Sequence, residues 1–151
     1  MMMRDDLRGA AALRLLQSAD ELRDRLSGAF AAVHGLSVNE FLLLMHLERA
    51  GENTLSRVEL AKRLFVSAST VTRMIAPMEK IGLVSREVAE RDARLALVNI
   101  TKAGAEKLKD AKLTFKQHAS YAFEDRWSND DIATLSDLLH RFVAGRTAHL
   151  T

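Results

Sequence analysis

Apolar residues recur at steps of three and four positions through the first part of the chain, which is the spacing of one face of an α-helix. The residues in this stripe are Leu15, Ala19, Leu22, Leu26, Phe30 and Val33. The stripe predicts one long helix over residues 6–34, and Gly35 follows where a helix commonly ends. At ~1.5 Å per residue this helix would be longer than roughly 40 Å, which exceeds the width of a small domain. Its apolar stripe therefore needs a further surface to cover it.

Five further segments of helical pattern each follow a hydroxyl residue that can cap a helix N-terminus. The caps are Ser37, Ser56, Ser67, Thr101 and Ser128. Ser37 and Ser56 each have a glutamate three residues later, which is the spacing of a capping box. We expect the last helix to turn its apolar residues inward. These residues are Ile132, Leu135, Leu138, Leu139, Phe142 and Val143.

The helix that begins after Ser67 combines an apolar side with an interior proline. The apolar side consists of Val71, Met74, Ile75, Met78 and Ile81, and Gly82 ends the helix. An interior proline removes one backbone hydrogen bond and costs about 3 kcal/mol or more, so we expect Pro77 to bend this helix. We do not expect a break, because Met78 and Ile81 continue the apolar side beyond the proline.

A hairpin pattern follows Gly82. Residues 84–87 and 97–100 are predicted to be strands, and the polar residues 88–94 to be the tip between them. Two short helices, over 57–64 and 68–81, precede the hairpin and are joined by a tight turn without the glycine often found there. This order of elements is that of a winged helix-turn-helix. The predicted fold class is therefore mainly α with a small β-hairpin wing, flanked by long N- and C-terminal helices.

The second helix of this motif is the expected recognition helix, whose N-terminal half would face the edges of DNA bases. Because Val71, Ile75 and Met78 occupy its inward face, hydroxyl and basic side chains are left outward. The candidate DNA-binding residues here are Ser67, Ser69, Thr70, Thr72 and Arg73. Arg73 can bind a guanine through two hydrogen bonds, or a phosphate. Each hydroxyl alone is equally well explained as a solvated helix position, so the arrangement carries the prediction.

Basic residues concentrate in the middle of the chain, although the net charge is only +2. Residues 57–102 hold nine Lys or Arg and five Asp or Glu, which gives a local charge of +4. A locally basic surface favours a polyanionic partner such as DNA, whereas an ordinary solvated surface explains the charge alone equally well. A winged helix that has become a protein-interaction module is the competing interpretation. Acidic or apolar residues on the outward face would be typical of such a module.

Composition gives little support to other classes of function. The chain has no cysteine, which excludes disulfides, thiolate catalysis and Cys-based zinc sites, and which fits a reducing cytoplasm. The histidines lack metal-ligand spacing, and no phosphate-binding glycine loop or nucleophile motif is found. We therefore expect no enzyme activity, no cofactor and no metal. Residues 1–14 lack the apolar run of a signal peptide, and no stretch reaches the ~18 apolar residues of a membrane span.

The segment 36–142 resembles the MarR family of transcriptional regulators. The matching runs are LSVNEFLLLMHL, VELAKRLFVSASTVTRMIAPMEKIGLVSRE, RDARLALVNITKAG and WSNDDIATLSDLLHRF. The most specific part is Asp92-x-Arg94 followed by Thr101-x-x-Gly104. The resemblance implies a homodimer that binds a palindromic operator in double-stranded DNA. The family consists mostly of repressors, and many members respond to small aromatic acids.

The resemblance also divides the single domain, 1–151, into functional parts. Residues 1–35 and 101–151 are expected to form dimerisation helices, and residues 36–100 the DNA-binding winged helix-turn-helix. The candidate interface residues lie in apolar stripes that still need a partner, and a second copy of the chain is a natural one. They are Leu15, Leu22, Ile132, Leu139 and Phe142. A monomeric helical core is the alternative.

The wing supplies the remaining candidate DNA contacts, Arg91 and Arg94. A narrow, A·T-rich minor groove favours an inserted guanidinium, and Asp92 is expected to support that of Arg94 through a charge-assisted pair. The alternative is a surface salt bridge that only shapes the hairpin. By resemblance alone, Thr72 and Arg86 match positions that can bind an aromatic carboxylate, although Arg86 is equally well explained as solvated or bound to phosphate.

Overall fold

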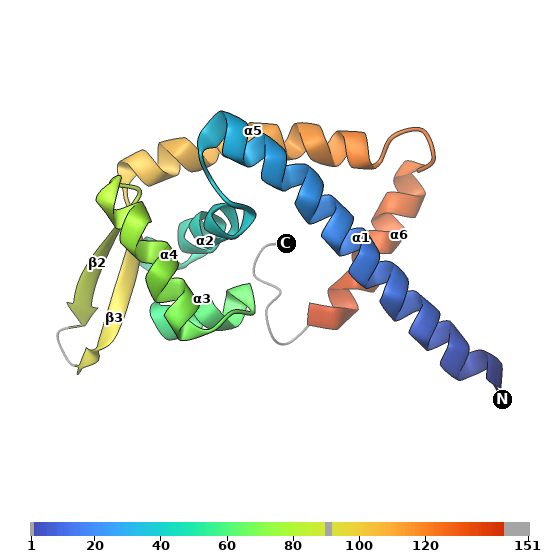
Figure 1. Cartoon of the computed structure of the whole chain (residues 1–151), viewed down its shortest axis with the longest axis horizontal. Helices are drawn as coiled ribbons and strands as arrows, with labels where there is room; N and C mark the ends of the chain where they lie inside the picture. Colours follow the sequence, from blue (N-terminus) through green and yellow to red (C-terminus); the bar gives the residue numbers. More distant parts are fainter. Residues whose placement is uncertain (1, 90–91, 144–151) are drawn as a thin grey trace.

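The computed structural model describes residues 2–89 and 92–143, in which six α-helices accompany a small sheet (Figure 1). The helices are α1 (Met2–His34), α2 (Val38–Arg49), α3 (Arg57–Leu64), α4 (Ala68–Lys80), α5 (Lys102–Ala122) and α6 (Asn129–Val143). The strands are β1 (Thr54–Ser56), β2 (Val84–Ala89) and β3 (Asp92–Ile100), and a short 3-10 helix, η1 (Gly51–Asn53), precedes β1. A winged helix between long helices confirms the predicted fold class.

All five predicted caps are confirmed as the starts of helices. In α2 the cap is reciprocal, because the Ser37 hydroxyl accepts from the Glu40 N–H at 3.0 Å and the Glu40 carboxylate accepts from the Ser37 N–H at 2.8 Å. The other four caps each accept from the N–H three residues later at 3.0–3.1 Å: Ser56, Ser67, Thr101 and Ser128. These bonds satisfy N–H groups that a helix leaves unpaired at its start. The starts of α2 to α6 can therefore be read from the sequence.

The sheet is larger than predicted. Its antiparallel strands lie in the order β1-β3-β2, and the three-residue strand β1 was not predicted. So short a strand is defined by its pairing with β3, which joins Thr54 to Asn99 and Ser56 to Leu97. The predicted tip over 88–94 is wrong, because β2 continues to Ala89 and β3 already begins at Asp92. Backbone pairing thus extends beyond the predicted end of the first strand, through Val88 and Ala89.

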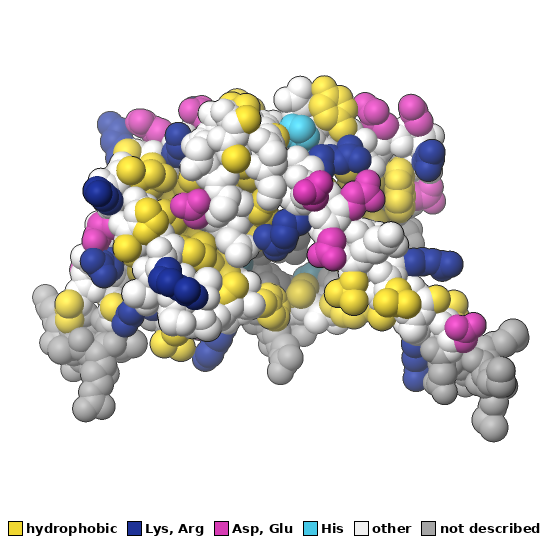
Figure 2. Space-filling view, viewed as in Figure 1, with side chains coloured by type: hydrophobic (Ala, Val, Ile, Leu, Met, Phe, Trp, Pro, Cys, Tyr) yellow, Lys and Arg dark blue, Asp and Glu magenta, His cyan; other side chains and the backbone are white. Residues whose placement is uncertain are grey.

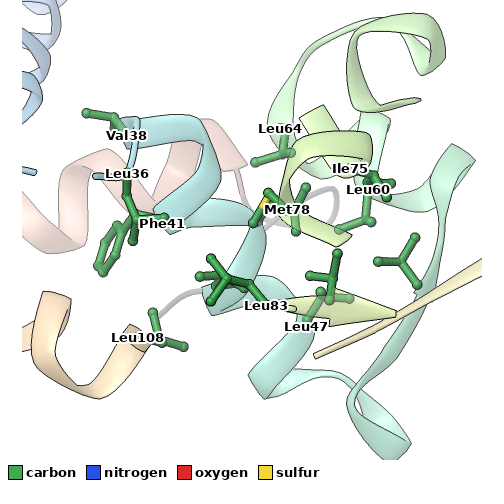
Figure 3. Close-up of a cluster of buried hydrophobic side chains, with 14 of the residues drawn as sticks. Leu36, Val38, Phe41, Leu47, Leu60, Leu64, Ile75, Met78, Leu83 and Leu108 are labelled. Carbon is green, nitrogen blue, oxygen red and sulfur yellow. The ribbon is translucent and has the colours of Figure 1, made fainter. Parts of the chain in front are cut away.

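The hydrophobic core surrounds α2, whose Phe41, Leu44 and Leu47 are buried against residues of α3, α4, β2 and α5 (Figure 3). An aromatic row connects this core to both long helices. The ring centroids of Phe30 and Phe41 are 4.7 Å apart, and those of Phe41 and Phe115 are 5.5 Å apart. The row fixes the C-terminal part of α1 and the middle of α5 against the winged helix.

Helix α4 continues through Pro77 without a break, as expected, and the bend expected at Pro77 stays a prediction. Its inward residues Val71, Ile75 and Met78 are fully buried. Ile81, however, is 64% exposed, so its predicted place on the apolar side is wrong. The helix ends at Lys80, and the chain then turns at Gly82, whose φ is +83°. Ile81 therefore leaves the helical path before its side chain would reach the core.

The N-terminal part of α1 and the whole of α6 lie beyond this core (Figure 1). None of the residues described for α6 is buried, so the prediction that its apolar residues turn inward is wrong for the chain on its own. Leu138, Leu139 and Phe142 are exposed. The reason is geometric, because α6 and α1 line an open groove between them instead of packing closely.

Within the described residues, no single helix is both long enough and apolar enough to cross a membrane. One pair of helical segments, Asp6–His34 and Val38–Arg49, meets the criterion only when the two are taken together, and it is bent by 80°. In this pair, Leu26 and Phe30 of the first segment and the buried apolar residues of α2 belong to the core described above.

Candidate nucleic-acid interface

The helix-turn-helix consists of α3, the turn 65–67 and α4. Phe65 ends α3 in the left-handed conformation, with φ 55° and ψ 42°, where glycine is the usual residue. The N–H of Val66 then donates to the carbonyl of Ala61 at 3.1 Å. The ring of Phe65 is 73% exposed. The missing glycine is thus replaced by a strained phenylalanine whose backbone still makes the required turn.

Hydroxyl groups form a connected cluster at the N-terminus of α4. The Ser67 oxygen lies 3.0 Å from the Ser69 oxygen and 2.9 Å from the Thr70 oxygen. An Arg73 Nη2 donates to the Thr70 hydroxyl at 3.4 Å. Ser67, Ser69 and Arg73 are exposed, and Thr70 is half-buried. The structure therefore brings these four predicted residues together on one outward surface, with the guanidinium one turn along the helix.

Thr72, also predicted to contact DNA, is held by another part of the motif. Its hydroxyl accepts from Nη1 of Arg57 at 2.6 Å and donates to the Ala68 carbonyl at 3.1 Å. Arg57 opens α3, so this bond ties the first helix of the motif to the second. The hydroxyl of Thr72 is therefore already used to connect α3 and α4.

Arg86 forms an ion pair with Glu79 that sequence reasoning missed. Nη2 of Arg86 donates to Glu79 Oε1 at 2.8 Å, Nε donates to both carboxylate oxygens at 3.1 Å, and the backbone N–H of Arg86 donates to Oε2 at 3.2 Å. Hydrogen bonds and charge from Arg86 lower the pKa of Glu79 below its ordinary value of 4.5, and the same pair raises the pKa of Arg86. The two residues lie in different elements, α4 and β2, on either side of a turn, so the period of a single helix or strand does not predict their pairing.

The wing residues fall at the edge of what the structure describes. The backbones of Asp92 and Arg94 belong to β3, but their side chains lie outside the described part, and Arg91 lies outside it altogether. Their predicted contacts therefore stay predictions. Figure 2 shows Lys and Arg side chains spread over the end of the molecule that carries the winged helix.

Gly104 joins the wing to α5 by a close backbone approach. Thr101 N–H donates to the Leu83 carbonyl at 3.1 Å. A Cβ at position 104 would lie 2.1 Å from that same carbonyl oxygen, far inside van der Waals contact. Only glycine fits there without a shift of the backbone. The Thr101-x-x-Gly104 motif therefore fixes where the last strand of the wing passes into the long helix.

Four of the five predicted interface residues line one groove. The groove has a volume of 890 Å³ and lies between α1, the end of α5 and α6. Its lining includes Leu15, Leu22, Leu139 and Phe142, together with Phe123 and Trp127. Ile132 is half-buried and does not line it. We call this surface the end groove.

No group of three or more metal-ligating side chains is found in the part of the chain that the structure describes. The histidine His34 is buried, and its Nε2 lies 2.7 Å from the hydroxyl oxygen of Thr114. It thereby joins α1 to α5, as expected of a structural histidine.

Known proteins resemble the chain in sequence. A family model described as the MarR family matches residues 34–95. The chain is 34% identical over 83 residues to the HTH-type transcriptional regulator YdgJ of Bacillus subtilis (strain 168), which covers 55% of this chain and 49% of that protein. It is 31% identical over 102 residues to the HTH-type transcriptional repressor YetL of the same organism, covering 66% of this chain and 61% of that protein. The chain thus spans about half to three-fifths of the length of these relatives.

The fold resembles solved structures over a larger part of the chain. One is the crystal structure of Sco3205, a MarR family transcriptional regulator from Streptomyces coelicolor, in complex with DNA. The two chains superpose with a TM-score of 0.80 at 23% identity, covering 91% of this chain and 86% of the other. The likeness therefore extends from the winged helix to the long helices on either side of it.

Proposed function

Because a MarR family model matches residues 34–95 and the chain is similar to HTH-type transcriptional regulators, we propose that it is a sequence-specific DNA-binding regulator of transcription of that family. The observation that carries the proposal is the outward surface of α4, where Ser67, Ser69 and Thr70 cluster beside Arg73. Small hydroxyls allow a close approach to DNA, and the N–H groups at a helix start favour phosphate. Arg73 supplies the side chain best suited to a guanine edge.

We propose that the regulator acts as a homodimer. The end groove supports this proposal, because Leu139 and Phe142 in its lining are exposed, whereas the inward faces of α2, α3 and α4 are buried within the chain. A second copy that covers the groove by two-fold symmetry would place two recognition helices about 34–36 Å apart, one turn of DNA. The expected operator is then an inverted repeat. The similarity to Sco3205, whose structure is described as a complex with DNA, supports the DNA-binding part of the proposal.

Repression is the mode of action that we infer. The relative named as a repressor, YetL, is similar over two thirds of this chain. The physical basis is occupancy, since a dimer held on an operator excludes other proteins from the same stretch of DNA. A reporter gene behind the selected operator tests it, and a rise in expression when the protein is supplied would contradict it.

We also propose that a small aromatic acid can bind at Thr72 and Arg86, but only by displacing the side chains that these residues already contact. Both residues already have partners within the chain, Arg57 and Glu79. A carboxylate would have to replace that of Glu79 on the guanidinium. Titrating salicylate-like acids against a protein–DNA complex tests this, and no release of DNA across the panel would argue against an acid effector at this site.

A protein-interaction module remains the second candidate function, and one experiment separates the two. Selection of bound fragments from a random DNA pool should return an inverted repeat, and binding should weaken steeply as salt rises because Lys and Arg release counterions from phosphate. An asymmetric half-site would contradict the dimer geometry. If no fragment is bound in a salt-dependent way, the DNA-binding proposal is wrong and the protein-interaction module is the remaining candidate.

Arg73 provides the sharpest single-residue test of the interface. Replacing Arg73 with Ala should weaken operator binding by about 1–3 kcal/mol and relax the preference at one position per half-site. An equal loss on all sequences would identify a phosphate contact instead. Lys62→Ala is a suitable control, because it removes an exposed charge of the same sign from α3 without touching the hydroxyl cluster.

A further inference from the structure

The wing leaves the body of the molecule at Arg86. Strand β1 supports β3 only as far as Leu97, the partner of Ser56. Arg86 stands opposite Val98, one position before that support ends, and the register of the hairpin shifts soon afterwards, between Val88 and Ala89. Beyond this point the described hairpin is held by β2–β3 pairing. Contacts at the base of the wing therefore determine the orientation of the wing relative to the rest of the molecule.

Glu79 reaches this base from the recognition helix. Its carboxylate accepts from the Arg86 guanidinium at 2.8–3.1 Å and from the Arg86 backbone N–H at 3.2 Å. It lies on the last turn of α4, two residues after Pro77. One carboxylate thus fixes both a side chain and the backbone of β2. Bonds of this kind constrain orientation more than a single contact between long side chains would.

The Glu79–Arg86 pair differs from the other described ion pair of the helix-turn-helix. Glu59 and Arg63 also pair, at 3.0 Å, but both belong to α3. That pair stabilises one helix and cannot set an angle between elements. The Glu79–Arg86 pair instead joins α4 to β2. Arg86 lowers the pKa of Glu79 and Glu79 raises the pKa of Arg86, mainly through their side-chain hydrogen bonds, so the pair favours the charged form of both groups.

We propose that Glu79 is a positioning residue for DNA binding, which aligns the wing with the recognition helix by holding Arg86. Glu79 itself touches no DNA in this scheme. It sets the direction in which the wing leaves the body, so that the wing and α4 reach adjacent grooves of one operator together. The DNA part of this inference rests on the proposed function, whereas the alignment of the wing is a property of the free protein.

Glu79→Gln is the direct test, with Glu59→Gln as its matched control. Both variants remove one negative charge and one ion pair with arginine from the same motif, so general charge effects on DNA affinity cancel. Operator affinity should fall about fivefold for Glu79→Gln relative to the control, within the range of a single exposed ion pair. The charge-swapped variant Glu79→Arg/Arg86→Glu should recover part of the loss.

Two further readouts separate positioning from simple stabilisation. In an Arg94→Ala background, where the wing has lost its expected contact, Glu79→Gln should change operator affinity no more than the control does. Because the chain has no cysteine, a spin label can be attached through Val88→Cys alone, at a side chain that is 63% exposed. Its spectrum should report a more mobile wing in Glu79→Gln and an unchanged wing in Glu59→Gln.

Equal label mobility in Glu79→Gln and its control would overturn the proposal, whatever the DNA result. So would an affinity loss that persists undiminished when Arg94 is absent, because the loss would then not pass through the wing. If the parent protein fails to bind DNA, the proposed function fails, and the label spectra alone decide whether Glu79 aligns the wing.

Discussion

The winged helix buries its inward apolar residues, whereas the end groove leaves some of its apolar residues exposed to solvent. In the winged helix, the inward faces of α2, α3 and α4 are covered by the chain itself, and Leu44, Leu60 and Ile75 are fully buried. In the end groove, Leu139 and Phe142 remain exposed on a helix without a single buried residue among those described. One region is complete as a monomer, whereas the other presents the kind of apolar surface that marks an interaction site.

Helix α1 belongs to the core at its C-terminal part and to the end groove at its N-terminal part. Leu26 and Phe30 are buried against the core, whereas Leu15 and Leu22 line the groove. The apolar stripe in the sequence is continuous across both parts. A stripe therefore indicates that a face will be covered, but it does not tell which chain will cover it. Substitutions in the two regions should accordingly differ in their dependence on protein concentration.

The largest expected effect is in the core of the winged helix. Leu44→Ala removes a fully buried side chain of α2 and should lower the free energy of unfolding by about 2–5 kcal/mol through lost burial and a cavity. Denaturant unfolding at two protein concentrations measures it, and the loss should be the same at both. If the loss of unfolding free energy becomes smaller at high protein concentration, the winged-helix core is not complete within one chain, and the two regions do not differ as described.

A second large effect is expected where the wing meets α5. Gly104→Ala places a methyl group against the Leu83 carbonyl and should destabilise the fold by about 1–3 kcal/mol, as overpacking does. Gly28→Ala in α1 is the control, because no atom lies within 4 Å of the added Cβ in this chain. Thermal unfolding of both variants checks the pair. A Gly104→Ala variant as stable as the parent would contradict the close approach.

The end groove should respond through assembly. Leu139→Ala trims an exposed side chain of the isolated chain, so its cost should appear as a dimer dissociation constant raised about tenfold, which is ~1.4 kcal/mol. Sedimentation over a micromolar concentration range measures the change. The control is Leu113→Ala, an exposed leucine of α5 outside the groove lining. A parent protein that sediments as a monomer would refute the proposed homodimer.

The smallest expected effect has the opposite sign and lies in the turn of the helix-turn-helix. Phe65→Gly should stabilise the protein by up to about 1 kcal/mol, because left-handed φ costs an L-residue ~1–2 kcal/mol and glycine's extra freedom when unfolded offsets part of this. Phe65→Ala keeps the Cβ and should bring no such gain. If both variants lose stability equally, the exposed ring makes a contact that outweighs its strained backbone.

The sequence allowed the helices of the winged helix to be placed because their signals are local. Ser37, Ser56 and Ser67 each satisfy N–H groups of the helix that they start, so a few neighbouring residues determine each boundary. The inward side of α4 was found for the same reason, with the exception of Ile81. That residue lies one position past the end of the helix, where periodicity no longer applies.

The missed features depend on residues far apart in the chain. Strand β1 exists because Leu55 pairs with Val98. A segment of only three residues has no hydrophobic pattern that would predict this distant partner. The ion pair of Glu79 and Arg86 depends on the turn at Gly82, which brings the end of α4 back along β2. In the candidate site, the hydroxyl cluster could be predicted from helix geometry, but the commitment of Thr72 to Arg57 required the packing angle of two helices.

The aromatic row of Phe30, Phe41 and Phe115 also orders events during protein synthesis. At about 5–20 residues per second, Phe115 leaves the ribosome several seconds after Phe30. The buried part of α1 therefore emerges well before α5, its main partner among the helices. Until then its apolar face is open to chaperones and to other nascent chains. The core is therefore completed only once α5 has been synthesised, and the proposed pairing of two chains would follow that step.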